Sequence, residues 1–390
     1  MSFKYQVYKT QRVCMIRFRR QIDGEPYYEY PDLDNRGSFR QYTDGNFDRG
    51  PVVSVMKGDD THIKILRERI DKSAPLFATS SDEATMTVNN KNQLPADYSM
   101  TLQLTGVQGI GGTLPKKAGL RIHYGSPTGV VIGELGVWVF TKMSVNLTPH
   151  RVTVSDATGA GVVSQVSIGA VIGMTKAFWR PYGIVINDAP VVNTPFVAAT
   201  AGQVVWGEHD ALLGTSATPG SINAYFVSQT DPNMLGWGFS RAFINDPANG
   251  RTNPGIILAD RDGGFDRHLD THYLANDLAH EIGHFFGLAH VDNRSPDGTA
   301  ANANNFRDDT WARRCLMHNF NASLFTANPP PGSPQNVGYG TNSALGNRGN
   351  RGGLVTLKDL TDANNSTTNH ITDPEYVTAR NTINSSAGPY

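Results

Sequence analysis

The chain of 390 residues carries 34 lysines and arginines against 35 aspartates and glutamates, which gives a formal net charge of −1. This balance excludes a strong field of one sign, so we expect neither nucleic acid nor an acidic membrane surface as a partner. With 39% hydrophobic residues, the chain can form two ordinary domains, each with its own core. No segment approaches the roughly 18 consecutive apolar residues of a membrane span, and none is predicted.

The N-terminal residues lack the pattern of a secretory signal. Basic residues occur early, but no apolar run of roughly 7–15 residues follows them, which leaves a leaderless route as the alternative for export. The chain has 2 cysteines, Cys14 and Cys315, too few for a disulfide framework or a cysteine-rich zinc site. A bridge between them is one alternative. For Cys14, a buried inert thiol is preferred over a thiolate that blocks a metal site.

The first 140 residues are predicted to be rich in strands. Short strand-like pieces separated by turn clusters fill residues 1–70, which we interpret as a β-rich lead-in. From 71 to 140, apolar and polar residues alternate in half-buried strands such as 98–106 and 119–125. An antiparallel sandwich is the natural way to bury such strands.

The pattern changes near residue 140, where we place the domain boundary. A helix is predicted within 163–182 and should be stopped by Pro181. Residues 301–370 are rich in Asn, Gly, Pro and Ser and are predicted to be irregular, and a terminal helix should follow with Asp373 as N-cap and Pro374 in its first turn. Strands are expected at 143–154, 183–187, 221–229 and 255–260. Residues 141–390 are therefore predicted to form a mixed α and β domain.

A further helix is predicted from about Thr271 to Gly287. Its apolar side chains recur on one face, as the burial of a helix requires. Those residues are Leu274, Leu278, Ile282, Phe285 and Phe286. The opposite face can then present polar side chains to a site.

The polar residues of this helix predict a metal centre. His280 and His284 are four positions apart and share a face, so both can ligate one ion. Gly287 can adopt the left-handed conformation that ends the helix, after which His290 would reach the same ion. Three neutral imidazoles leave a fourth position for water, which is typical of a catalytic zinc site. Glu281 lies on the flank of the helix, where its carboxylate can act as general base.

An alternative interpretation is that these histidines only form hydrogen bonds within a core. The chain has 11 histidines, so the chance of three of them and a glutamate falling at this spacing is small. The metal centre is therefore the preferred interpretation.

Residues 280–290 match the pattern HExxHxxGxxH without a gap, and in this the chain resembles the metzincin superfamily of zinc metallopeptidases. That family also has a tight turn with a methionine beneath the zinc, to which the resemblance assigns Met317. The resemblance covers about residues 141–390. It implies an α+β fold class: a catalytic domain with a mixed sheet, an active-site helix and an irregular C-terminal subdomain, here preceded by the sandwich-like region.

The subfamily is not indicated by the residues around the motif. Asn319 stands where astacin-like and serralysin-like members carry a zinc-binding tyrosine, which excludes a tyrosine switch at that position. Val291 stands where adamalysin-like members, otherwise similar in their Cys-x-Met turn, have an aspartate. The chain resembles the superfamily without matching one of these branches.

Two weaker features complete the candidate site. The loop 260–266 groups three carboxylates around two glycines and could hold calcium, although a solvated acidic turn is the preferred interpretation. His318 and Tyr339 are candidates for stabilising an oxyanion, with a structural role preferred for each.

The function that follows from these expectations is a zinc-dependent endopeptidase acting on a protein or peptide substrate. An edge strand near 255–260 would hold the extended substrate through main-chain hydrogen bonds. The alternative is a binding, delivery or toxin-like effector protein in which residues 1–140 carry the main function.

Overall fold

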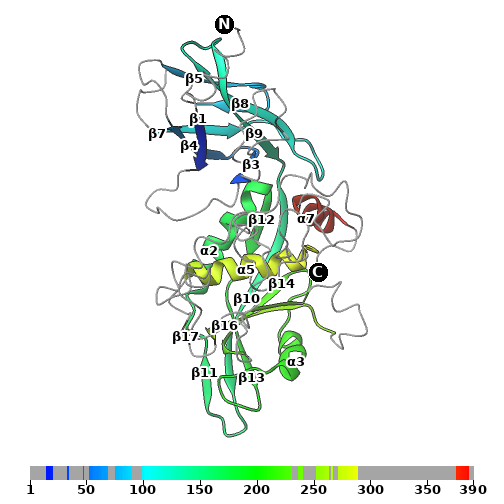
Figure 1. Ribbon diagram of the computed structural model, residues 1–390. Coiled ribbons are helices and arrows are strands. Elements are labelled where there is room, and N and C mark those ends of the chain that lie inside the picture. Colours follow the sequence, from blue (N-terminus) through cyan, green and yellow to red (C-terminus); the bar gives the residue numbers. More distant parts are fainter. Residues whose placement is uncertain are drawn as a thin grey trace, which may run out of the picture. The chain divides into compact units, whose positions relative to one another are not determined.

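The computed structural model shows a chain of mixed α and β structure, as predicted. It divides into two compact units, and the division falls between Lys142 and Met143, with Pro181–Gly183 belonging to the first unit (Figure 1). The structure describes residues 15–20, 33–34, 47, 52–68, 75–89, 99–230, 236–239, 252–262, 265–266, 271–288 and 375–385.

The first unit contains two sheets. One is antiparallel throughout, in the order β1-β4-β7-β6, and the other has the order β2-β3-β9-β8-β5, in which only β3 and β9 are parallel. The strands of the first sheet are β1 (Met15–Arg20), β4 (Asp60–Glu68), β6 (Met86–Val88) and β7 (Ser99–Gly106). Those of the second are β2 (Leu33–Asp34), β3 (Val52–Met56), β5 (Leu76–Ser80), β8 (Lys116–Tyr124) and β9 (Val130–Phe140).

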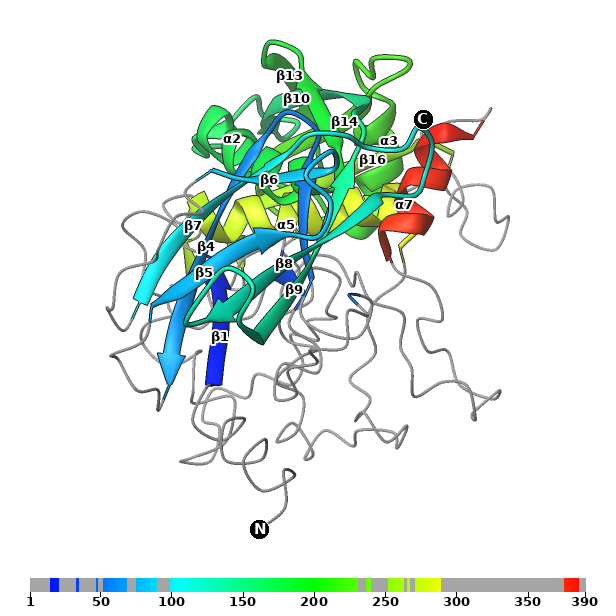
Figure 2. The same cartoon turned by 90° about the horizontal axis from the view of Figure 1, so that it is seen from above.

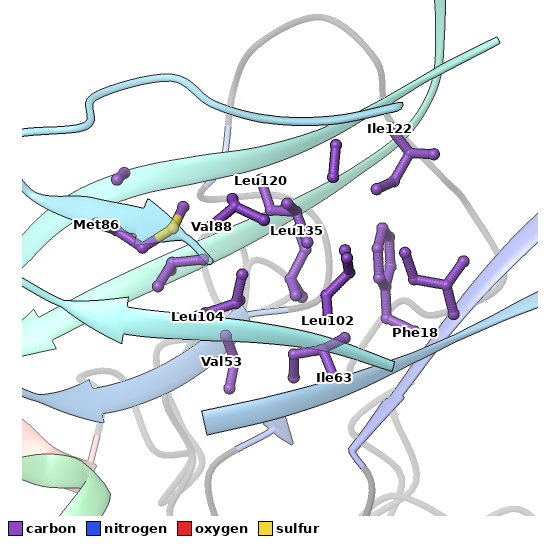
Figure 3. Close-up of a cluster of buried hydrophobic side chains, with 14 of the residues drawn as sticks. Phe18, Val53, Ile63, Met86, Val88, Leu102, Leu104, Leu120, Ile122 and Leu135 are labelled. Carbon is purple, nitrogen blue, oxygen red and sulfur yellow. The ribbon is translucent and has the colours of Figure 1, made fainter. Parts of the chain in front are cut away.

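Alternate residues of the two sheets meet in a single apolar core. Ile63 of β4 pairs with Leu102 of β7, and both side chains are fully buried. Figure 3 shows these residues facing Leu120 and Leu135 of the other sheet. Because side chains in a strand point alternately to opposite faces, each sheet covers the other with one of its faces. The predicted sandwich is present, with one parallel strand pair that was not expected.

The predicted division at residue 70 does not match these sheets. Strand β4 lies between β1 and β7, and β3 lies beside β9. Residues 52–68, which the sequence analysis placed in a lead-in, are therefore interior strands of the sandwich. The alternation of apolar and polar residues predicts that a strand exists. Which strands pair, when they lie far apart in the chain, depends on tertiary contacts.

The second unit is built on one mixed sheet in the order β11-β10-β14-β16-β15. Strands β10, β14 and β16 are parallel to one another, whereas β15 is antiparallel to β16 at the edge. The long β10 also pairs with β12 and β13, and Pro149 falls between these two pairings, where its missing N–H is tolerated. The strands are β10 (Met143–Ser155), β11 (Gly161–Val163), β12 (Ile184–Asp188), β13 (Val192–Val197), β14 (Ile222–Gln229), β15 (Gly236–Phe239), β16 (Gly255–Asp262) and β17 (Phe265–Asp266).

The prediction of an edge strand at 255–260 is wrong. Strand β16 pairs with β14 on one side and with β15 on the other. The edge is formed by the four residues of β15, which are too few and too rich in glycine to show an alternating pattern.

Helices cover the sheet of the second unit. Helix α2 (Ile168–Trp179) ends in the short helix η1 (Arg180–Tyr182), which contains Pro181, as predicted. It packs beside α5 (Thr271–Phe285), where Thr175 Oγ1 donates to the Ala275 carbonyl at 3.1 Å. Helix α3 (His209–Gly214) follows the short helix η2 (Trp206–Glu208). Its Leu212 and Leu213 belong to a cluster of buried apolar side chains that also includes Tyr225 and Ile257.

The terminal helix α7 spans Glu375–Asn384. In the views of Figures 1 and 2 it lies at the C-terminal end of α5. Asp373, Pro374 and the irregular region predicted for 301–370 lie outside the described residues. No helix within the described ranges is long and apolar enough to span a membrane.

Candidate metal centre

The centre is built on α5, which presents two histidines one turn apart. The ring centroids of His280 and His284 are 4.9 Å apart, and the ring planes make an angle of 86°. His280 is 9% exposed, and His284 is half-buried. The helix thus brings together the first two predicted ligands, as the spacing of four residues requires.

The hydrogen bond of His284 defines which ring nitrogen can bind a metal. Its Nδ1 lies 2.9 Å from the Leu288 carbonyl oxygen. A carbonyl can only accept, so the proton is on Nδ1, and Nε2 carries the lone pair that a metal requires. Burial lowers the pKa of His284 and outweighs the opposing effect of this hydrogen bond. A neutral ring with a defined tautomer is the form that ligates zinc.

The end of α5 confirms the predicted role of Gly287. Its φ angle is +78°, and its N–H donates to the His284 carbonyl at 3.0 Å. The N–H of Leu288 donates to the Gly283 carbonyl, also at 3.0 Å. Together these bonds form the left-handed helix cap in which glycine is strongly preferred. The chain therefore turns away from the helix at Gly287, three residues after His284, and the N–H of Leu288 is held against the last turn.

Helix α7 closes the other side of this cap. A Cβ atom added to Gly287 would lie 3.3 Å from Thr382 Oγ1 and 3.7 Å from Thr378 Cγ2. Both threonines belong to α7, so the C-terminal helix packs directly on the turn that follows the histidine pair. Glycine is thus required at position 287 for its left-handed conformation and is also favoured by this close approach.

Glu281 lies on the side of α5 that packs on β15. A Cβ atom added to Gly238 would lie 2.7 Å from Glu281 Oε2 and 3.0 Å from its main-chain oxygen. The carboxylate therefore reaches the edge strand of the sheet. Gly238 was not predicted as a site residue, and the signal for it in the sequence was the glycine-rich segment 236–238.

Several predicted site residues lie outside the described residues. These are His290, Met317, His318, Tyr339, Val291, Asn319 and both cysteines. Within the described ranges, no group of three or more His, Cys, Asp or Glu side chains could hold a metal ion. His280 and His284 still fit zinc, because their rings lie together on one helix face and His284 has the required tautomer.

The acidic loop considered for calcium has a different organisation. Asp260 is buried at the end of β16, and its carboxylate accepts hydrogen bonds from Ser164 Oγ and the Gln165 N–H, each at 2.7 Å. Residues 261–262 pair with 265–266 as a short hairpin. Asp260 therefore ties the segment before α2 to the sheet, which is a structural use of the carboxylate.

The chain matches no family model and no curated protein. Solved structures of a surface-layer protein are among those that it matches. The crystal structure of the S-layer protein rSbsC(31-844) matches with 22% identity and a TM-score of 0.19, over 24% of this chain and 12% of that chain. The structure of SbsC domains 4 and 5 matches with 21% identity and a TM-score of 0.16, over 22% and 46%. The matched part thus spans less than half of either chain.

Proposed function

We propose that this protein is a zinc-dependent endopeptidase. The observation that carries the proposal is the pair formed by His280 and His284 on α5, with the tautomer of His284 set by the Leu288 carbonyl. Glu281 follows His280 directly and reaches the edge strand β15. A helix with two neutral imidazoles and an adjacent carboxylate suits hydrolysis at a metal ion.

Each residue has a separate role in this proposal. His280, His284 and His290 would hold the zinc, and Met317 would lie in the turn beneath it. Zinc, when bound, supplies a Lewis acid that makes water nucleophilic near neutral pH. Glu281 accepts a proton from the attacking water and returns it to the leaving nitrogen of the peptide.

The substrate would be an extended segment of a protein or peptide. Strand β15 has β16 on one side, and the structure describes no strand on its other side. Main-chain groups at a sheet edge can pair with an extended peptide regardless of its side chains. The edge strand is also the one that packs on Glu281, so a peptide along β15 would lie beside the proposed base.

The test is the variant Glu281→Gln, compared with Glu83→Gln, a change at an exposed turn of the sandwich unit. The amide has nearly the same shape but cannot accept the proton. We expect normal zinc content and a kcat on a peptide substrate that falls by roughly 10²–10⁴-fold, the contribution of general acid–base catalysis. The control should match the wild type. A Glu281→Gln enzyme with full zinc and undiminished turnover contradicts the mechanism.

A second candidate function is binding by the sandwich unit. Its loop 107–114 exposes three apolar side chains, Val107, Ile110 and Leu114, with exposed fractions of 40%, 52% and 57%. Neighbouring exposed apolar residues can mark an interaction surface. If Glu281→Gln abolishes turnover but leaves the biological activity of the protein unchanged, the binding function is favoured over the peptidase.

A further inference from the structure

We propose that Gly238 is a positioning residue for Glu281. The absence of a side chain at this position lets the edge strand lie directly against the helical turn that bears the proposed base. This inference rests on the proposed function, which it extends to a residue outside the zinc-binding motif.

The contact is made at Gly238, the third residue of β15. Gly238 is opposite Ile256 of β16 in the antiparallel register, and β15 also packs along α5. A Cβ atom at position 238 would meet three atoms of Glu281: Oε2 at 2.7 Å, the main-chain oxygen at 3.0 Å and Cα at 3.4 Å. All three belong to the same residue.

Neither element can move away easily. Helix α5 also packs against α2, and Phe286, directly after α5, meets Trp179 of α2 edge to face at 4.9 Å. Ile282, next to Glu281, and Ile256, opposite Gly238 in the neighbouring strand, are both fully buried. Since cores are close-packed, a methyl group at position 238 would displace the part that is least constrained, which is the Glu281 carboxylate.

An alanine at position 238 should disturb the metal ligands much less than it disturbs Glu281. The orientation of His284 depends on the Leu288 carbonyl, beyond the turn that carries Glu281. Displacement of a catalytic group by about 1 Å can lower the rate by about 10²-fold. The signature of a positioning residue is therefore a loss of kcat without a matching loss of zinc.

The first measurement compares Gly238→Ala with Gly173→Ala in the full chain. Gly173 lies in α2, where an added Cβ atom meets nothing within 4 Å. We expect Gly238→Ala to lower kcat on a peptide substrate by about 10-fold or more, with KM and zinc content changed less than about twofold. Gly173→Ala should match the wild type.

The second measurement needs no activity. Thermal unfolding of the metal-free protein is followed for Gly238→Ala, Glu281→Ala and the double variant. We expect Gly238→Ala to lower the unfolding temperature by about 3 °C or more, and by less when Glu281 is already alanine, because one colliding group is then absent. Equal shifts in both backgrounds would show that Gly238 does not act through the Glu281 side chain, and would overturn the inference.

The two proposals fail in different ways. A wild-type protein that binds no zinc and cleaves no peptide refutes the endopeptidase, and with it the catalytic meaning of Gly238, whatever the unfolding cycle shows. A wild type that cleaves peptide beside a Gly238→Ala variant with unchanged kcat refutes only the positioning role. Loss of zinc in proportion to kcat refutes it as well, because the effect would then be structural.

Discussion

The two units differ in what they bury. Among the Asp, Glu, His, Lys and Arg side chains that the structure describes in the sandwich unit, Glu134 is the one that is buried, and Arg121 pairs with it at 3.0 Å. The described residues of the second unit include six buried side chains of these types: His150, His209, Asp260, Asp277, His280 and Arg380. Burying ionisable groups is unfavourable unless they are paired or used, so such groups gather where a protein has chemistry to perform. The difference places the candidate chemistry in the second unit.

Not every buried ionisable group belongs to the metal centre. His150 Nε2 donates to Asn223 Oδ1 at 3.0 Å, and His150 Nδ1 lies 2.9 Å from Thr194 Oγ1. Its ring stacks on Tyr225 with centroids 4.2 Å apart. Both nitrogens therefore have partners within the core, which is the pattern of a structural histidine. His284 instead donates from Nδ1 to the main-chain carbonyl of Leu288, at the end of α5.

The largest effect is expected from His284→Ala. Two remaining imidazoles form a much weaker site than three, so zinc should fall from about one ion per chain to nearly none and peptidase activity should be lost. The control is His62→Ala, on an exposed position of β4 in the sandwich unit. Metal analysis after dialysis checks the result. Full zinc occupancy in His284→Ala would contradict the proposal that the second unit holds the metal centre through this histidine.

The next largest effect is expected on the stability of the sandwich unit alone. Leu104 is fully buried between the two sheets, and Leu104→Ala should cost about 2–5 kcal/mol of stability. If the units fold separately, calorimetry should show one transition lowered, while zinc content and kcat stay unchanged. A variant that loses zinc together with the sandwich transition would mean that the units do not act independently.

A pH effect is expected in the second unit. Burial lowers the pKa of His150 below its ordinary value of 6.5, so the unfolded state binds this proton more readily than the folded one. The stability of this unit is therefore present above about pH 6.5 and declines as the pH falls below it. The metal-free protein should show this decline in thermal unfolding, and His150→Gln should reduce it. An equal decline in both proteins would assign the effect to other groups.

The smallest effect is expected at the surface of the second unit. Lys176 of α2 forms an ion pair with Asp188 of β12, and the side chains are 36% and 37% exposed. Exposed ion pairs typically contribute about 0.2–1 kcal/mol, so Asp188→Asn should change the unfolding free energy by no more than this. A loss comparable to that of Leu104→Ala in denaturant unfolding would show that surface charge matters more here than burial.

The sequence by itself determined the local structure that carries the candidate site. The spacing of His280 and His284 requires only a helix, and the apolar face from Leu274 to Phe286 predicts one, which α5 confirms. Gly287 likewise ends the helix through its own conformational freedom, a property of one residue and its near neighbours. These features could be predicted because their contacts lie within a few residues of the chain.

Only the tertiary structure decided how distant segments meet. The parallel pairing of β3 with β9 joins residues about 80 positions apart, and alternation within a strand does not specify its partner. The same holds for β15, whose four residues place β16 inside the sheet and bring Gly238 against Glu281. The surroundings of the proposed base depend on this packing between elements, which local patterns of hydrophobicity and spacing do not encode.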